Sequence, residues 1–121
     1  MKPSVRSTHK NEALARNRKK ILEFQARVCK TFSNAKRLEV VILLKTGEMT
    51  VSDLTKALKT TKANTSQHLT VMRMSGLLKT RRDGTSIYYR IANKKLANAC
   101  SLMQEALLQI MNGHPQGLGL D

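Results

Sequence analysis

The hydrophobic pattern of this chain changes period at Gly76, and that change limits the folds it can adopt. Up to Gly76 the apolar residues recur at helical spacing, whereas residues 78–82 and 85–91 alternate apolar and polar side chains. The two alternating stretches flank Asp83-Gly84, a dipeptide typical of β-hairpin turns. We therefore expect a helical chain that contains one β-hairpin.

The burial pattern of the hairpin agrees with a loop made of these two residues. The expected opposite pairs are Leu78 with Tyr89 and Thr80 with Ile87. This register gathers the apolar side chains on one face, which can pack on the helices.

Five helices are expected from apolar spacing and capping residues. Residues 11–32 form a long amphipathic helix, and Ser33 and Asn34 interrupt it and can cap a second one. The inward side chains of the second helix are Leu38, Val41, Ile42 and Leu44. Thr50 caps a short third helix, and residues 62–75 form a fourth. Two short helices joined by a tight turn, the second rich in Ser, Thr, Asn, Gln and His, indicate a helix-turn-helix.

The last helix follows Asn93, which can cap it. Its apolar stripe consists of Leu96, Ala99, Cys100, Met103, Leu107 and Ile110. We expect one domain over residues 11–112, a flexible basic arm over residues 1–10 and a flexible tail over residues 113–121.

Positive charge is concentrated in two parts of the chain. Of the formal net charge of +14, residues 1–20 carry +6 and residues 56–95 carry +9, whereas residues 21–55 carry +1 and the last 26 residues carry −2. Such a field suits a polyanionic partner, either nucleic acid or an anionic membrane. Because the larger block coincides with the helix-turn-helix and the hairpin, double-stranded DNA is the favoured partner.

Several classes of protein are excluded by what the chain lacks. Its longest apolar run, residues 40–44, is too short for a membrane span, which takes about 20 residues. No apolar stretch of a secretory signal follows the basic N-terminal residues. The chain has no glycine-rich phosphate loop, no paired carboxylates and no catalytic spacing of His and Cys. We expect a cytoplasmic protein that is not an enzyme, has no cofactor and contacts no membrane.

Short motifs fall in a regular order along about residues 20–110. They are FSNAKRL at 32–38, VSDL at 51–54, SQHL at 66–69 with Met72, GLL at 76–78, RRDG at 81–84 and YYRI at 88–91. Together they resemble the ArsR/SmtB family of small bacterial repressors, although each motif is weak alone. Ala35 replaces the proline that is frequent in the family, and alanine also starts helices well.

The resemblance implies a mainly α fold with a small β-hairpin, the winged helix-turn-helix, with about five helices and a two-stranded wing. It also implies a homodimeric transcriptional repressor that binds operator DNA with inverted half-sites and releases it when an effector arrives. The residues agree with a homodimer, because the long first and last helices carry apolar stripes that a small core cannot cover.

The fourth helix and the tip of the hairpin supply the predicted DNA contacts. Gln and Asn pair with adenine, Lys reaches guanine, and an alanine methyl group contacts the thymine methyl group. In the family, the positions that match Lys62, Ala63, Ser66, Gln67 and His68 line the DNA. The full predicted set is Lys62, Ala63, Asn64, Thr65, Ser66, Gln67, His68, Arg73, Arg81 and Arg82. His68 has a second interpretation, as a side chain packed next to Leu69.

The metal sites of the family are not matched here. Its thiolate site needs cysteines where this chain has Met49, Thr50 and Ser52. Its zinc site on the last helix needs Asp, His and Glu ligands, of which residues 93–112 offer only Glu105. We therefore expect no metal ligands in this chain.

Two interpretations stay open for Cys29 and Cys100, which lie on the helices expected at the dimer interface. In one, a thiol oxidant, reactive sulfur or a thiophilic metalloid acts on them and releases the DNA, although the family's dithiol sulfur sensors place their cysteines elsewhere. In the other, both are small buried core residues, and the protein is an effector-independent or architectural DNA-binding protein. Oxidation that leaves operator binding unchanged and forms no cross-link would exclude the first.

An RNA-binding winged helix is a further alternative. It is disfavoured because Tyr88 and Tyr89 are adjacent on a strand, so they point to opposite faces and form no stacking platform.

Overall fold

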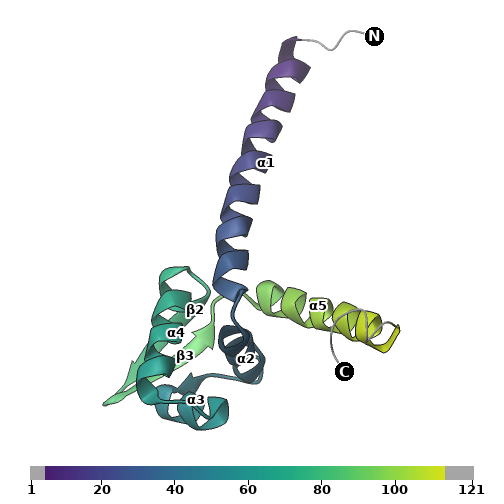
Figure 1. The fold of residues 1–121 in the computed structure, drawn as a ribbon. Coiled ribbons are helices and arrows are strands. Elements are labelled where there is room, and N and C mark those ends of the chain that lie inside the picture. The colour runs from purple at the N-terminus through teal and green to yellow at the C-terminus, as the bar shows by residue number, and fades with distance from the viewer. Residues whose placement is uncertain (1–4, 114–121) are drawn as a thin grey trace. The chain divides into compact units, whose positions relative to one another are not determined.

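The computed structural model describes residues 5–113, with side chains from His9 onward. Within this range the elements are α1 Val5–Phe32, α2 Ala35–Leu44, β1 Met49–Thr50, α3 Val51–Leu58, α4 Lys62–Met74, β2 Leu78–Asp83, β3 Ser86–Ile91 and α5 Lys94–Gly113 (Figure 1). The chain divides into two compact units between Ser33 and Asn34, so the predicted domain over residues 11–112 runs across this division. The described part of the first unit is α1, and the remaining elements form the second unit.

The first helix begins earlier than the sequence predicts. Residues 5–10, expected as part of a flexible arm, are helical, so the predicted start at Asn11 is corrected to Val5. The pattern missed this end because these residues have no apolar period to mark a helix. Further along α1, four large apolar side chains are more than half exposed: Leu14, Ile21, Leu22 and Phe24. Residues 1–4 of the predicted arm lie outside the described residues.

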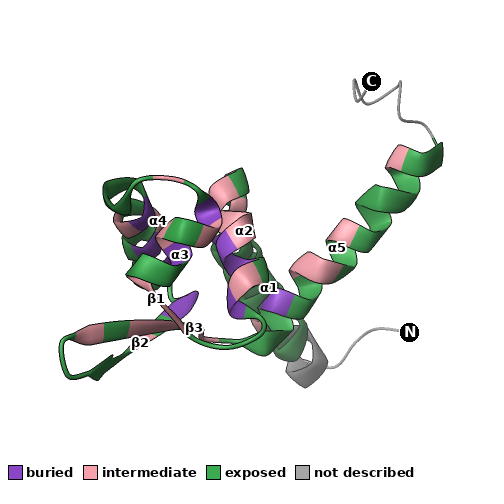
Figure 2. Ribbon diagram, turned by 90° about the horizontal axis from the view of Figure 1, so that it is seen from below, coloured by how far each residue is buried: buried purple, intermediate pink, exposed green. Residues whose placement is uncertain are grey.

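The core of the second unit lies where α2, α3 and α4 meet, and Figure 2 shows their buried residues on the facing sides of these helices. The fully buried side chains are Val40, Leu54, Leu58, Thr65, Leu69 and Met72. Lys36 Nζ, on the first turn of α2, donates a hydrogen bond of 2.7 Å to the carbonyl oxygen of Leu58, the last residue of α3. A cation at the C-terminal end of a helix is stabilising, so this contact helps to hold α2 on α3.

Polar side chains begin each helix of this core. The side-chain oxygen of Asn34 accepts the backbone N–H of Arg37 on α2, and that of Thr50 accepts the backbone N–H of Asp53 on α3. Both caps were predicted from the sequence and are confirmed. They satisfy backbone donors that the first turn of a helix leaves unpaired.

The inward side of α2 differs from the prediction. Val41 and Leu44 are buried as expected, but Val40 is fully buried while Ile42 is 47% exposed. Leu38 is only half-buried. Residues 40–44 are all apolar, so the sequence contains no period that tells which of them face the core. Packing against α3 and α4 decides it.

The predicted hairpin is formed by β2 and β3, and β1 adds a short third strand. The strand order is β1-β3-β2, all antiparallel, with Met49 opposite Tyr89 and Thr50 opposite Tyr88. Two residues are too few to show an alternating pattern, which is why β1 was not predicted. Its pairing attaches the hairpin to the segment that leads into α3.

The predicted register of the hairpin is wrong by two residues. Leu78 lies opposite Ile91, and the loop is Gly84-Thr85 instead of Asp83-Gly84. Gly84 has a φ of +63°, whereas the φ of Thr85 is not positive. This combination is typical of a two-residue hairpin turn with glycine at its first loop position. A shift of two keeps every side chain on its predicted face, so the apolar face of the hairpin is retained.

The apolar stripe predicted on α5 is mostly uncovered in the single chain. Cys100 is half-buried, whereas four members of the stripe are 37–63% exposed: Leu96, Met103, Leu107 and Ile110. The buried side chain of α5 is that of Ala97, which is not part of the predicted stripe. Of the helices in the described part of the chain, none is long and apolar enough to cross a membrane. α5 ends at Gly113, and the rest of the predicted tail, residues 114–121, lies outside the described residues.

The two methionines of α4 test this packing with the same substitution at two positions. Met72 is fully buried and Met74 is 80% exposed. We expect Met72→Ala to lower the free energy of unfolding by about 2–5 kcal/mol, because it leaves a cavity in the core. Met74→Ala should change it by less than about 0.5 kcal/mol. Urea unfolding of the full chain without DNA measures both values, and equal losses would contradict this orientation of α4.

Candidate nucleic-acid interface

One row of side chains on α4 is packed into the core, and the opposite row faces solvent. The inner row is Thr65, Leu69 and Met72. The hydroxyl oxygen of Thr65 lies 3.0 Å from that of Thr55 and 3.0 Å from the carbonyl oxygen of Thr61. The sequence predicts Thr65 as a DNA contact, and that prediction is wrong, because the side chain is fully buried and hydrogen-bonded inside the protein. Its spacing from Leu69 and Met72 is the signal that assigns it to the core.

The solvent side of α4 carries most of the other predicted contacts. The exposed ones are Lys62, Ala63, Asn64, Gln67 and Arg73, and Ser66 is half-buried. Two exposed residues outside the predicted set, Thr70 and Met74, continue the line of Ala63 and Gln67 at steps of three and four residues. The spacing from Gln67 could have identified Met74.

Polar contacts fix the turn that precedes α4. Lys59 ends α3 with a φ of +54°, a left-handed conformation that reverses the chain direction. Thr61 Oγ1 accepts the backbone N–H of Asn64 at 3.1 Å, and Asn64 Nδ2 donates to Thr60 Oγ1 at 3.3 Å. The side-chain amide of Asn64 keeps its oxygen and a second N–H available to a ligand.

His68 lies at the edge of this surface and is half-buried. Arg37 Nε, on α2, donates to His68 Nδ1 at 3.3 Å, which requires that nitrogen to be unprotonated. Burial, followed by the nearby charges of Arg37 and Lys36, lowers the pKa of His68. Arg37 was absent from the predicted site, yet it lines a shallow hollow on this face together with Ser66, Gln67, His68, Thr70 and Val71. No sequence pattern joins residues 37 and 68, which only the packing of α2 on α4 brings together.

On the wing, Arg81 and Arg82 point to opposite faces of β2 because side chains alternate along a strand. Arg81 Nε lies 3.0 and 3.2 Å from the two carboxylate oxygens of Glu48, and its guanidinium carbon lies 4.5 Å from the ring centre of Tyr88. The hydrogen bond between them lowers the pKa of Glu48 and raises the pKa of Arg81. The sequence predicts that both arginines lie at the solvent-exposed tip of the hairpin. Both are exposed there, and Arg81 is in addition bonded to Glu48.

The two cysteines lie in different units of the chain. Cys29 is exposed on α1, and Cys100 is half-buried on α5. Release of DNA by thiol chemistry at this pair stays a prediction. Within the described residues, no group of three or more His, Cys, Asp or Glu side chains could hold a metal ion.

Known proteins share the sequence motifs of the second unit. Residues 34–80 match the family described as "Bacterial regulatory protein, arsR family". The HTH-type transcriptional regulator Rv0324 of Mycobacterium tuberculosis is 36% identical over 84 residues, which cover 69% of this chain and 37% of that protein. The arsenical resistance operon repressor of Escherichia coli is 37% identical over 78 residues, which cover 64% of this chain and 67% of the repressor. The chain therefore spans little more than a third of the length of Rv0324.

A solved structure shares the fold. It is the homodimeric winged helix-turn-helix DNA-binding domain Mb0332 from Mycobacterium bovis, which is 32% identical, with a TM-score of 0.73 over 80% of this chain and 90% of that one. This likeness confirms the predicted winged helix-turn-helix, mainly α with a β-hairpin. β1 makes the sheet one strand larger than the predicted wing.

The environment of His68 predicts an acid dependence of stability. Because the pKa of His68 is lowered in the folded chain, the unfolded chain binds this proton first as the pH falls. The free energy of unfolding should therefore decrease below the usual His pKa of about 6.5, and His68→Gln should remove that part of the decrease. Urea unfolding at about pH 7.5 and about pH 5.5, on either side of this value, measures the effect.

His9→Gln is the matched control, since His9 is exposed on α1. It should keep the acid dependence of the unchanged chain. If His68→Gln also keeps it in full, the assignment of a neutral, Arg37-bonded His68 is wrong.

Proposed function

Because the chain belongs to the ArsR family of bacterial regulatory proteins, we propose that it is a transcriptional repressor that binds operator sequences in double-stranded DNA as a homodimer. The observation that carries this proposal is the outward row of α4, with Ala63 and Gln67 exposed on a helix whose inner row is fully packed. Repression is supported by the arsenical resistance operon repressor, which is 37% identical. The site of action that follows is the cytoplasm, where operator DNA is located.

Base recognition belongs to the outward row of α4. An α-helix fits the major groove, where Gln67 and Asn64 can each pair with an adenine through their amide groups. Lys62 can donate to the acceptors of guanine, and the methyl group of Ala63 can contact the thymine methyl group. Ser66 lies at the edge of this row, where its hydroxyl can reach either a base or a phosphate.

Phosphate contacts come from the basic side chains around α4. Arg73 is exposed on the last turn of that helix, and Arg82 is exposed on the wing. Arg81 has a different role in this proposal. Its bonds to Glu48 fix the orientation of the wing, while its charge adds to the field that attracts DNA. His68, whose Nδ1 accepts from Arg37, can offer only its second ring nitrogen, Nε2, to the DNA.

The homodimer is supported by the uncovered apolar side chains of α1 and α5. Large apolar side chains at the surface of a small protein mark an interface when they form a continuous stripe. The stripes on both helices consist of residues that are about half exposed in the single chain, among them Ile21, Phe24, Leu107 and Ile110. A twofold partner would cover both stripes and place the two copies of α4 in successive major grooves, about 34 Å apart.

A selection from random DNA duplexes by the purified full chain tests the proposal. We expect enrichment of an inverted repeat whose half-sites are centred about 10 base pairs apart. If the dimer makes about six to ten phosphate contacts, its affinity for that duplex should fall roughly 10³–10⁵-fold between about 50 and 200 mM salt. Single-stranded RNA should compete poorly.

Other outcomes of the selection identify the rival functions. Binding without any enriched sequence would indicate an architectural, sequence-blind DNA-binding protein. An enriched sequence without twofold symmetry would rule out the homodimer. An affinity that does not change with salt would rule out the assigned phosphate contacts.

A further inference from the structure

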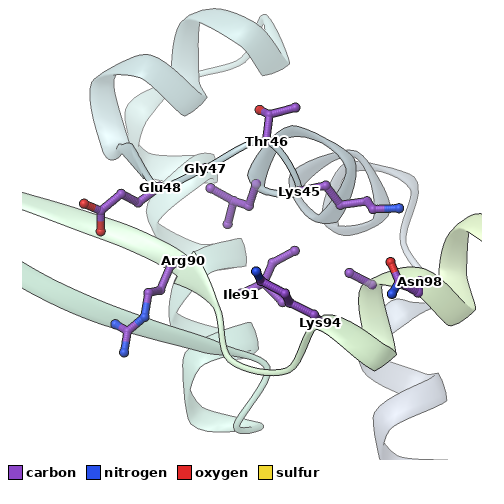
Figure 3. Close-up of a pocket in the computed structure, with 10 residues that line it drawn as sticks. Lys45, Thr46, Gly47, Glu48, Arg90, Ile91, Lys94 and Asn98 are labelled. Carbon is purple, nitrogen blue, oxygen red and sulfur yellow. The ribbon is translucent and has the colours of Figure 1, made fainter.

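A hollow of about 460 Å³ opens in the second unit, away from the outward row of α4. Its walls come from the end of α2, the turn that leads to β1, the end of β3 and the start of α5 (Figure 3). Leu44 and Ala97, each 3% exposed, and the half-buried Ile91 give it an apolar floor. Its volume lies within the usual range for small-molecule sites, about 300–1,000 Å³.

The charged side chains around the hollow are mainly positive. Lys45, Arg90 and Lys94 line it, against a single carboxylate, that of Glu48. Glu48 already binds Arg81 of the wing, so its charge is compensated by a residue outside the lining. Lys45 Nζ donates to Ser101 Oγ on α5. Figure 3 shows Lys94 extending into the hollow beside Ile91, with Lys45 and Glu48 on opposite sides of it.

We propose that this hollow is a binding site for a small organic anion with one carboxylate and a compact apolar body. The apolar body would rest on Leu44, Ile91 and Ala97, and the carboxylate would accept from Lys94, with Arg90 and Lys45 adding to the positive field. One cation that points inward fits a single carboxylate better than a polyphosphate. The apolar floor distinguishes this site from a surface that merely attracts phosphate.

The site is independent of the proposed DNA function, because α4 contributes none of the side chains that form it. It does join parts of the fold that the proposed function uses. α5 carries the uncovered apolar stripe, β3 leads into the wing, and Glu48 holds Arg81. An occupant of the hollow therefore contacts the first turns of α5 and the end of β3, where the wing joins the rest of the second unit.

Benzoate is the probe that tests the site, with benzamide as its neutral match of the same shape and acetate as the charge without the apolar body. The ¹⁵N-labelled full chain, without DNA, is titrated with each compound while the backbone amide signals are followed. We expect saturable shifts with benzoate that centre on Gly47, Ile91 and Ala97. Benzamide and acetate should each bind about tenfold more weakly, the size expected when one charge-assisted hydrogen bond or the apolar contact is lost.

The substitution Lys94→Gln should weaken benzoate about tenfold for the same reason. Lys95→Gln is the matched control, because Lys95 is the exposed neighbour of Lys94 and is not part of the lining. Both side chains are on the surface, so both variants should fold. The proposal is overturned if benzoate shifts no amides around the hollow, if benzamide binds as tightly as benzoate, or if the two variants behave alike. Because no DNA is present, these results are separate from those of the operator selection.

Discussion

The packing of the inner row of α4 is the constraint on which the candidate site depends. Thr65, Leu69 and Met72 are fully buried where α4 meets α2 and α3. A helix that buries one row must present the opposite row to solvent, which is why Ala63 and Gln67 are exposed. The close approach of the Thr55 and Thr65 hydroxyls adds a directional contact to this apolar packing and sets the rotation of α4 on α3. The same rotation decides which side chains can meet a DNA groove.

A second set of contacts positions the wing relative to that core. β1 pairs with β3, and Glu48, the residue just before β1, binds Arg81 on β2. The segment between α2 and α3 therefore holds both strands of the hairpin. It also forms one wall of the apolar hollow, so the core, the wing and that hollow share one short stretch of chain.

Much of this arrangement could be predicted from local sequence. The caps at Asn34 and Thr50 have side chains that bond the next turn whatever the tertiary structure, and both were found from residue type and spacing. The side chains of the hairpin lie on their predicted faces although the predicted register is wrong by two residues, because side chains alternate with a period of two along a strand. The prediction of a homodimeric transcriptional repressor came from the motifs that resemble a known family. The residue pattern alone supports that prediction only in part.

What the sequence did not reveal depends on contacts between distant residues. Thr65 is a polar residue type that is usually exposed, and its hydrogen bonds to Thr55 on α3 and to the carbonyl oxygen of Thr61 satisfy its hydroxyl at the core position that its spacing from Leu69 and Met72 gives it. Val40 and Ile42 are equally apolar, so only packing separates the buried one from the exposed one. The pairs Arg37–His68 and Glu48–Arg81 join residues more than thirty positions apart, and no local period reports them.

The central claim is that the outward row of α4 selects the DNA sequence, and a change of Gln67 tests it most directly. Selection from random duplexes would be run with the unchanged chain and with Gln67→Lys, and Gln109→Lys, exposed on α5, would serve as the control. Because glutamine pairs with adenine and lysine with guanine, the account predicts a change of preference from adenine to guanine at one position of each half-site for Gln67→Lys alone. An enriched sequence that is the same for all three chains would contradict it.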